Sequence, residues 1–190
     1  FHEATENAER LDPDDVALPR IPVQPIGWGA AEQIMQHMTG QEVASNAWQG
    51  GLPLRYRLEG GPDLIVSLSV EQNRRIMETA NVIGTLQGSE EPNQMIVIGA
   101  HHDAWECGAA DATSGLIAVM EAARAFSDLA AKGHTPRRTI KFAGWGAEEV
   151  GIIGSTEWVE SRPDALRAGG GAYLNLDMAS MGPHFGSSAS

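Results

Sequence analysis

The sequence MIVIGAHHDAW, residues 95–105, places a continuous apolar run directly before two histidines and an aspartate. An uninterrupted run such as Met95 to Ala100 is typical of a strand that is buried on both faces of a sheet. Two similar runs follow it along the chain, RTIKFAGW at 138–145 and AYLNLD at 172–177. We therefore expect three strands in the second half of the chain.

Two helical patterns separate these strands. Apolar residues recur at helical spacing through 113–131, and Gly133 follows where a glycine often ends a helix. A second helical stretch covers 154–167. The order strand, helix, strand, helix, strand is typical of right-handed crossovers between parallel strands. The fold class that we expect is therefore α/β.

The first half of the chain has a weaker pattern. Residues 1–20 are acidic and poor in large apolar side chains, which is typical of a linker or a chain end. Helical spacing of apolar residues predicts a helix over 28–38. The stretch 45–62 is rich in glycine and proline and predicts a loop. Alternating apolar residues predict a strand over 64–70, and a second strand over about 76–87.

Length and composition exclude several classes of protein. With 190 residues, 42% of them hydrophobic, the chain can form one domain with a core, and collagen, low-complexity and coiled-coil chains are excluded. No apolar run approaches the roughly 20 residues of a membrane-spanning helix. A net charge of -12 argues against a nucleic-acid partner, whose phosphates repel acidic groups. The single cysteine, Cys107, excludes an internal disulfide and a CxxC metal site.

Polar side chains follow each of the three expected strands. In open α/β sheets, ligands bind beyond the carboxyl ends of the strands. The residues found there are imidazoles and carboxylates, namely His101, Asp103, Glu148, Glu149 and Asp177. Asp111 joins them from the loop that leads into the helix over 113–131. We expect these side chains to gather at one edge of the sheet.

This set of residues favours a metal site. Zinc accepts imidazole nitrogen and carboxylate oxygen, and a catalytic zinc site leaves one position for water. The candidate ligands are His101, Asp111, Glu149 and Asp177. One imidazole and three carboxylates exceed what a single ion needs beside water. The excess favours a pair of metal ions about 3.5–4 Å apart.

Asp103 and Glu148 support the ligands in this interpretation. Asp103 lies two residues after His101, so on an extended backbone its carboxylate can accept the second imidazole N–H and fix the tautomer. Glu148 can face the bound water while Glu149 ligates, and the neighbouring carboxylates should raise the pKa of Glu148, which suits a general base. Taken singly, each motif has a structural alternative: Asp111 can cap a helix, and the two glutamates can complement a helix dipole.

Other chemistries have weaker support. The chain contains no G-x-S-x-G elbow, no phosphate-binding P-loop and no G-x-G-x-x-G after the first of these strands. Cys107 is a conceivable nucleophile, but its glycine-rich loop favours a small residue without a chemical role. His102 should point away from the candidate site on an extended backbone. His37 and His134 have no partner pattern, and we expect both at the surface.

Several motifs together resemble the glutamate carboxypeptidase II and transferrin receptor family. They are NVIGTLQG (81–88), IGAHHDAW (98–105), Asp111 followed by TSG, RRTIKFAGWGAEEVGIIGSTEW (137–158) and AYLNLD (172–177). IPVQPIG (21–27) resembles the stretch where the family's chain re-enters its protease domain. The resemblance covers roughly residues 15–180. It implies a co-catalytic zinc metallopeptidase whose fold is a three-layer α/β/α arrangement around a mixed, mainly parallel sheet.

The resemblance implies a role for each candidate residue. The metal ligands would be His101 and Asp177 on one zinc, Glu149 on the other and Asp111 between them. Glu148 would be the catalytic base, which takes a proton from the attacking water and returns it to the leaving amine. Asp103 would support catalysis indirectly, because it would contact the ligand His101 and not the zinc. The complete enzyme would hold two Zn²⁺ and act on peptides as a carboxypeptidase- or aminopeptidase-type exopeptidase.

The resemblance also implies that the chain is only part of such an enzyme. Residues 1–20 would be a linker or the remnant of an inserted apical domain, and 21–190 a partial zinc peptidase domain without its C-terminal part. The family's second zinc has a further His ligand far downstream of Asp177, and His184 does not match that motif. We therefore expect one zinc, and an inactive chain, if nothing completes the site.

Two further expectations depend on the resemblance. Family members form homodimers, and most are exported or membrane-anchored, through regions that we do not find in this sequence. The family also includes a receptor without zinc, so a non-catalytic, receptor-like or truncated pseudoenzyme on the same fold is the alternative to a peptidase. Retention of His101, Asp111, Glu148, Glu149 and Asp177 favours the peptidase.

Overall fold

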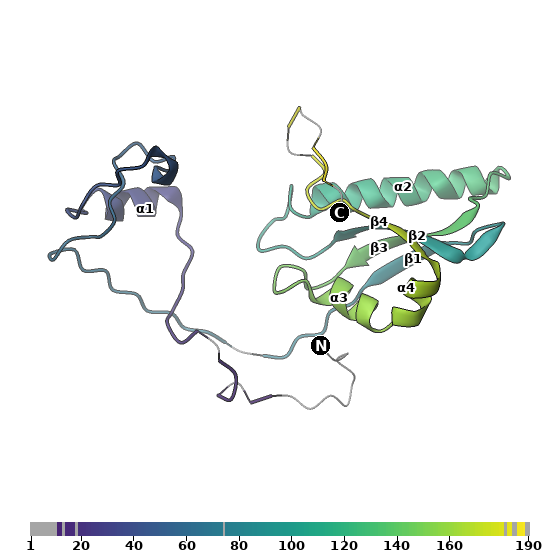
Figure 1. The fold of residues 1–190 in the computed structure, drawn as a ribbon, viewed down its shortest axis with the longest axis horizontal. Coiled ribbons are helices and arrows are strands. Elements are labelled where there is room, and N and C mark those ends of the chain that lie inside the picture. Colours follow the sequence, from purple (N-terminus) through teal and green to yellow (C-terminus); the bar gives the residue numbers. More distant parts are fainter. Residues whose placement is uncertain are drawn as a thin grey trace. The chain divides into compact units, whose positions relative to one another are not determined.

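The computed structural model describes residues 11–12, 14–17, 19–73, 75–180, 182–183 and 186–188. These residues form two compact units, one within Arg10–Arg75 and one within Ile76–Ser190. Figure 1 labels the helices and strands of both units. No described helix is long and apolar enough to cross a membrane.

The unit within Arg10–Arg75 has little regular structure. It contains the helix α1 (Trp28–Met35), a 3-10 turn (Asn46–Trp48) and an isolated bridge between Glu42 and Arg57. The expected helix begins where the sequence predicts it but ends earlier. None of the described residues from 11 to 73 is buried. This unit therefore has no apolar core of its own among the residues that can be described.

The prediction of a strand over 64–70 is wrong. These residues pair with no other strand, and Ile65 is 87% exposed. The alternation of apolar and polar residues is present, but a strand needs a neighbour to bond its backbone, and no described segment of this unit supplies one. The second expected strand, over 76–87, forms only at Val82–Leu86, where it joins the sheet of the other unit.

The unit within Ile76–Ser190 is a four-stranded sheet with helices on both faces. The strands are β1 (Val82–Leu86), β2 (Glu91–His101), β3 (Arg138–Trp145) and β4 (Gly170–Asn175), in the order β1-β3-β2-β4. Strand β2 runs parallel to β3 and β4, whereas β1 is antiparallel to β3. The α/β class and the mixed, mainly parallel sheet are confirmed.

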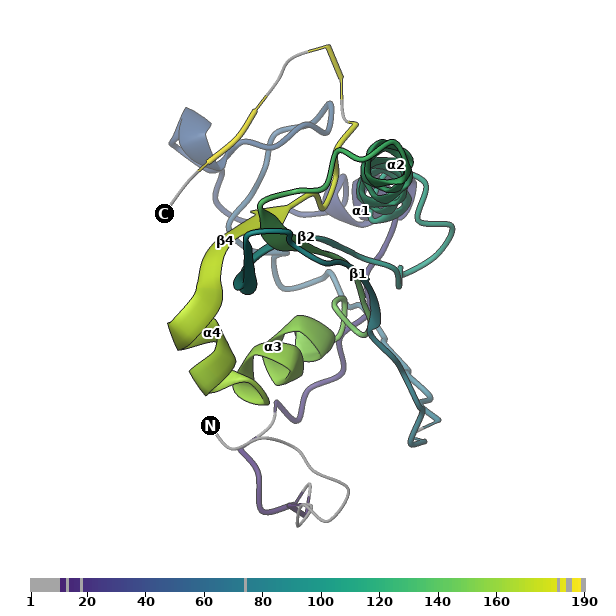
Figure 2. The same cartoon turned by 90° about the vertical axis from the view of Figure 1, so that its right-hand side faces the viewer.

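Three helices complete this unit. They are α2 (Thr113–Ala131), α3 (Ile153–Glu160) and α4 (Pro163–Gly169). Figure 2 shows α2 on one face of the sheet and α3 with α4 on the other, which gives three layers. The single helix expected over 154–167 is divided in two, because Pro163 lacks the N–H that a continuing helix needs and instead occupies the first turn of α4.

Each face of the sheet has its own apolar cluster. On the α2 face, Val119 packs with three sheet residues, namely Ala100, Ile140 and Phe142. On the other face, Trp158 of α3 packs with Val97, Ala143 and Trp145. The two indole rings lie 5.4 Å apart at 56°, a tilted arrangement that aromatic pairs favour. These clusters fix the strands whose ends carry the polar residues.

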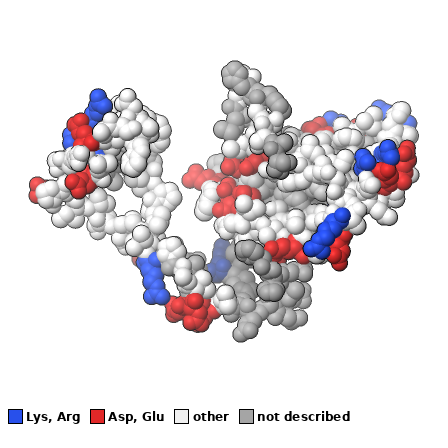
Figure 3. All heavy atoms as spheres, viewed as in Figure 1, with Lys and Arg blue, Asp and Glu red and all other residues white. Residues whose placement is uncertain are grey.

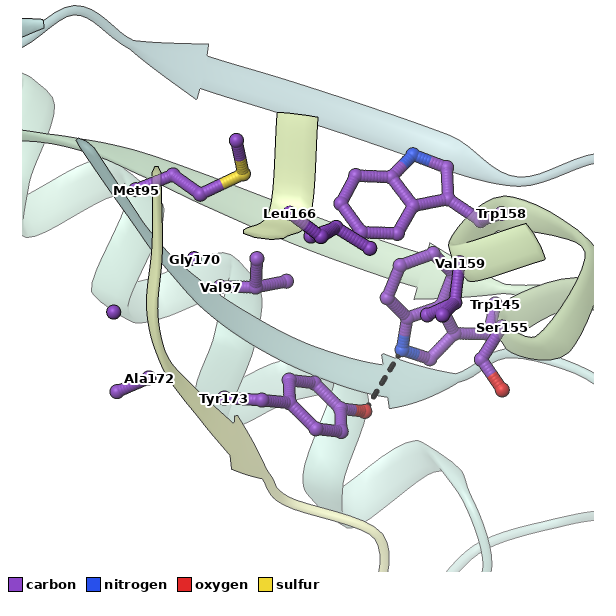
Figure 4. A pocket seen from close by; sticks show the side chains of 11 residues that line it. Met95, Val97, Trp145, Ser155, Trp158, Val159, Leu166, Gly170, Ala172 and Tyr173 are labelled. Carbon is purple, nitrogen blue, oxygen red and sulfur yellow. Dashed lines mark hydrogen bonds between the residues drawn. The ribbon is translucent and has the colours of Figure 1, made fainter. Parts of the chain in front are cut away.

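An apolar cavity lies on the face of α3 and α4. Its volume is about 300 Å³, and Trp145, Trp158 and Tyr173 line it with smaller apolar residues. Figure 4 shows the Trp145 indole pointing toward Tyr173, to whose hydroxyl it donates a hydrogen bond of 2.9 Å. Tyr173 in turn donates to Asn175 Oδ1 at 2.8 Å. Burial raises the pKa of Tyr173, although the Trp145 hydrogen bond opposes the rise.

Candidate metal centre

Parallel pairing brings the candidate residues to one edge of the sheet. His101 is the last residue of β2 and is paired with Trp145, the last residue of β3. Strand β4 ends at Asn175, two residues before Asp177. Asp111 lies in the loop that enters α2, and the peptide bond between Asp111 and Ala112 is cis. Figure 3 shows acidic side chains gathered at the end of this unit where these loops lie.

Three carboxylates converge on one imidazole nitrogen. His101 Nε2 lies 2.8 Å from Asp111 Oδ1, 3.0 Å from Asp177 Oδ1 and 4.0 Å from Glu148 Oε2. The His101 side chain is only 3% exposed, whereas the carboxylates are partly open to solvent. One ligand atom from each of His101, Asp111 and Asp177 lies within 4.8 Å of the others. Among the described residues, this is the group that offers such a set of donors.

The second imidazole nitrogen decides what Nε2 can do. Nδ1 lies 2.9 Å from the backbone carbonyl oxygen of Asp103, which can only accept a hydrogen bond, so Nδ1 carries a proton. In the neutral imidazole, the lone pair of Nε2 then faces Asp111 and Asp177. Acceptors that face one another in this way need a proton or a cation between them. Hydrogen bonding through Nδ1 is also how histidine is oriented when Nε2 binds a metal.

The donor set fits a divalent cation. Asp111 Oδ1 is buried without a hydrogen-bond partner, although it lies next to His101 Nε2. A buried oxygen that lacks a donor is rare in native proteins, and binding of a cation is one arrangement that satisfies it. One imidazole and two carboxylates are ligands that zinc accepts, with a further position for water.

The same geometry shifts the pKa of His101. Burial lowers this pKa, but the Asp177 hydrogen bond and the charges of Asp177 and Glu148 outweigh it, helped by the Asp103 carbonyl, so the pKa is raised above 6.5. Without a metal, the cluster therefore holds a proton on His101 more strongly than an ordinary histidine does.

Asp103 connects the ends of β2 and β3. Its carboxylate accepts hydrogen bonds from the backbone N–H of Glu148 at 2.9 Å and of Glu149 at 3.2 Å. Burial opposes ionisation of Asp103, but these two N–H groups, with a smaller effect from His101, lower its pKa below 3.8. The sequence led us to expect the Asp103 carboxylate on the imidazole N–H. The backbone carbonyl takes that place, and the nearest carboxylate oxygen is 3.6 Å from Nδ1.

The two glutamates differ in their surroundings. The pKa of Glu148 is raised by burial and by Asp177, Glu149 and Asp103, although His101 opposes the rise. The Glu149 backbone is held by Asp103, but its carboxylate makes no hydrogen bond or ion pair with any described residue. Of the four ligands expected from the sequence, the structure thus brings His101, Asp111 and Asp177 together and leaves Glu149 outside that group.

The remaining candidates are separate from this cluster. His102 Nε2 bonds the carbonyl oxygen of Ala80 at 2.8 Å, consistent with its expected turn away from the site. Cys107 is exposed. His184 lies outside the described residues.

Sequence reasoning assigned no site role to Gly115, in the first turn of α2. A Cβ there would overlap the carbonyl oxygens of Leu176 and Asp177, so glycine lets this helix approach a candidate ligand closely. The glycine of the TSG that follows Asp111 was visible as part of a motif, but its contact partner lies about 60 residues away and gives no local signal.

Three curated proteins illustrate what this chain is similar to. The chain is 36% identical over 186 residues to the "Probable glutamate carboxypeptidase VP8" of Zea mays, with 96% of this chain and 26% of that protein covered. It is 38% identical over 190 residues to the "Probable glutamate carboxypeptidase LAMP1" of Arabidopsis thaliana, with 98% and 27% covered. It is 37% identical over 180 residues to the "Aminopeptidase NAALADL1" of Rattus norvegicus, with 90% and 24% covered.

The chain thus spans about a quarter of the length of these curated relatives. Among solved structures, an aminopeptidase from Aneurinibacillus sp. strain AM-1 is 34% identical, with a TM-score of 0.47 over 52% of this chain and 24% of that chain. The model of peptidase family M28 matches residues 81–185, which is more than half of the chain and includes every candidate site residue. The resemblance inferred from the motifs is confirmed, and the chain belongs to peptidase family M28.

Proposed function

We propose that the chain carries the metal-binding and proton-transfer residues of a zinc-dependent exopeptidase. The observation that carries this proposal is the convergence of Asp111 and Asp177 on His101 Nε2, at 2.8 and 3.0 Å, where a neutral imidazole has no proton to donate. Membership of a peptidase family supports peptides as the substrate class.

His101, Asp111 and Asp177 would hold one zinc ion. Asp111 would also contact a second zinc, for which Glu149 would be a ligand once its carboxylate turns toward the cluster. When bound, zinc makes a peptide carbonyl more electrophilic and a neighbouring water more acidic. His101, Asp111 and Asp177 form one group of possible donors. We therefore expect this chain to bind one zinc tightly and a second only if a further ligand is supplied.

Glu148 would move the proton. Its carboxylate lies at the rim of the cluster, 4.0 Å from His101 Nε2, and its raised pKa suits a group that accepts a proton near neutral pH. It would take the proton of the attacking water and pass it to the amine that leaves. The Asp103 carboxylate would hold the Glu148 backbone during both steps.

Replacement of Glu148 tests this assignment. Glu148→Gln removes the base but no proposed ligand, so zinc affinity measured by calorimetry should stay within about threefold. In the full-length protein, peptide hydrolysis should fall by about 10²–10⁴-fold. Glu78→Gln, at an exposed position in the same unit, is the matched control. An unchanged rate for Glu148→Gln would remove Glu148 from the mechanism.

The proposed exopeptidase is of carboxypeptidase or aminopeptidase type. Relatives that match equally well carry the printed names glutamate carboxypeptidase and aminopeptidase. The alternative, which comes from the family resemblance, is a receptor-like or pseudoenzyme role for the same fold, and it predicts no hydrolysis even when zinc is bound. We also propose, from the family alone, a homodimeric protein that is exported or membrane-anchored.

A further inference from the structure

The loop that carries Glu148 and Glu149 begins and ends at two glycines that touch. Gly154 N donates a hydrogen bond to Gly146 O at 2.9 Å, which closes the segment 146–154. A Cβ on Gly154 would overlap the backbone of Gly146 and the side chain of Asn81. A Cβ on Gly146 would lie 2.7 Å from the carbonyl oxygen of Ala80. The segment just before β1 therefore packs directly against both ends of this loop.

A single side chain bonds both ends of the loop. The Asn81 Oδ1 atom accepts a hydrogen bond from Gly146 N at 3.1 Å, and Asn81 Nδ2 donates one to Gly154 O at 2.8 Å. The Asn81 side chain is half-buried. Asparagine has a donor and an acceptor in one rigid amide, so it satisfies an N–H and a C=O at once. Aspartate keeps only the acceptor, and alanine has neither.

The loop needs to be held, because its backbone is strained. Ala147 and Ile152 adopt left-handed φ values of 53° and 57°, which cost a non-glycine residue of the order of 1–3 kcal/mol. Such conformations persist where surrounding contacts impose them. Backbone hydrogen bonds within the loop contribute, such as that from Ile153 N to Ala147 O at 3.0 Å. Side chains from outside the loop add the Asn81 amide at its base and the Asp103 carboxylate at Glu148 and Glu149.

Asn81 is itself anchored to the strand that ends at the metal centre. The preceding residue, Ala80, accepts a hydrogen bond from His102 Nε2, and the His102 backbone N–H donates to Trp145 O at 2.9 Å. His102 directly follows His101. Displacement of Asn81 would therefore disturb both the loop that it bonds and, through Ala80 and His102, the end of strand β2.

We propose that Asn81 is a positioning residue for Glu148 and Glu149. By closing the loop at Gly146 and Gly154, the Asn81 amide fixes the backbone that presents the proton-transfer carboxylate and the second metal ligand. The expected effect of Asn81 on catalysis rests on the proposed peptidase function. Its expected effect on the loop backbone does not.

The test compares Asn81→Ala and Asn81→Asp with the same substitutions at Asn93. Asn93 is an exposed residue of β2 whose side chain bonds no described residue. The first readout is amide hydrogen exchange in the metal-free chain. We expect the amides of Gly146, Glu148 and Glu149 to exchange at least about tenfold faster in Asn81→Ala, and to be unchanged in Asn93→Ala.

The second readout is kinetic. It requires a form of the protein in which a further ligand completes the site. With a set of aminoacyl p-nitroanilides and N-blocked dipeptides as probes, kcat should fall about 10–100-fold in Asn81→Ala while KM and the tight zinc site change little. Asn81→Asp, which is isosteric, should show an intermediate loss. If Asn81 had a purely structural role, only the Gly146 amide would exchange faster. The decrease in kcat would then equal the decrease in the fraction of folded protein.

The two proposals fail in different ways. If the unaltered chain binds no zinc, the proposed function is wrong, and the exchange of the Glu148 and Glu149 amides still decides the role of Asn81. If those amides keep their protection in Asn81→Ala, the inference is overturned. Should Asn81→Ala fail to fold, Asn81→Asp carries the same comparison.

Discussion

Protons and metal ions compete for the same atom, His101 Nε2. The raised pKa of His101 means that this competition extends to higher pH than at an ordinary histidine. Zinc displaces the proton, so zinc affinity should fall by about tenfold per pH unit once the pH drops below that pKa. Calorimetry between about pH 6 and about pH 8 measures the slope. His134→Gln, at an exposed histidine, should leave it unchanged, and a pH-independent affinity would remove His101 from the ligands.

Stability of the metal-free fold should have the opposite dependence on pH. A folded-state pKa raised above 6.5 at His101 adds stability that is fully present below pH 6.5 and is lost as the pH rises through the raised value. The raised pKa of Glu148 acts with the same sign, starting above its ordinary 4.5. Urea midpoints should thus decrease as the pH rises from about 6 to about 8 without metal, and this trend should weaken or reverse with zinc.

The sequence predicted the residues of the site better than their hydrogen bonds. His101, Asp111 and Asp177 could be placed together because each follows a strand or precedes a helix at one edge of a parallel sheet. The partner of His101 Nδ1 could not be predicted, because Asp103 offers both a carboxylate and a carbonyl within reach. The loop that carries Glu149 contains two left-handed residues, Ala147 and Ile152, and no local sequence pattern predicts them.

At the scale of elements, helix α2 and the end of β4 depend on each other. Gly115 lies so close to the carbonyl oxygens of Leu176 and Asp177 that Gly115→Ala must move one of the two segments. We expect an unfolding free energy lower by about 1–3 kcal/mol, as for overpacked sites, and weaker zinc binding because Asp177 moves.

A control lies at the other end of the same helix. Gly133 has a φ of 90° with nothing within 4 Å of an added Cβ, so Gly133→Ala should cost about 1–2 kcal/mol without any change in zinc affinity. Thermal unfolding and calorimetry of both variants separate the two effects. Equal zinc affinity in Gly115→Ala would show that Asp177 does not depend on the packing of α2.

Helices and strands were predicted well only where their apolar residues pack against a core. Helix α2 occupies 113–131 and β3 occupies 138–145, as expected, because a stripe and a continuous run both face the same core. The stretch 64–70 has equally clear alternation but no partner strand, and it forms none. The periodicity of a segment indicates which of its faces can be buried. Strand pairing depends on residues far away in the sequence, so the periodicity of one segment cannot predict it.

At the scale of the molecule, metal binding should stabilise one unit and not the other. The His101 cluster lies within Ile76–Ser190, whereas the described part of Arg10–Arg75 contains no such group of metal donors. Zinc at a hundredfold excess over its Kd should add about 2.7 kcal/mol to the first unit. In limited proteolysis, zinc should therefore slow cleavage within 76–190 relative to a chelator, and should leave cleavage within 10–75 unchanged. Equal protection of peptides from 10–75 would contradict this expectation.

Strand β4 lies at an edge of the sheet, and every one of its residues is exposed. An open edge is a template on which a strand of another molecule can form, so self-association of this chain at high concentration should begin there. The net charge of -12 opposes such contacts by repulsion between molecules. Added salt screens that repulsion and leaves backbone pairing intact, so colloidal stability should decrease as ionic strength rises.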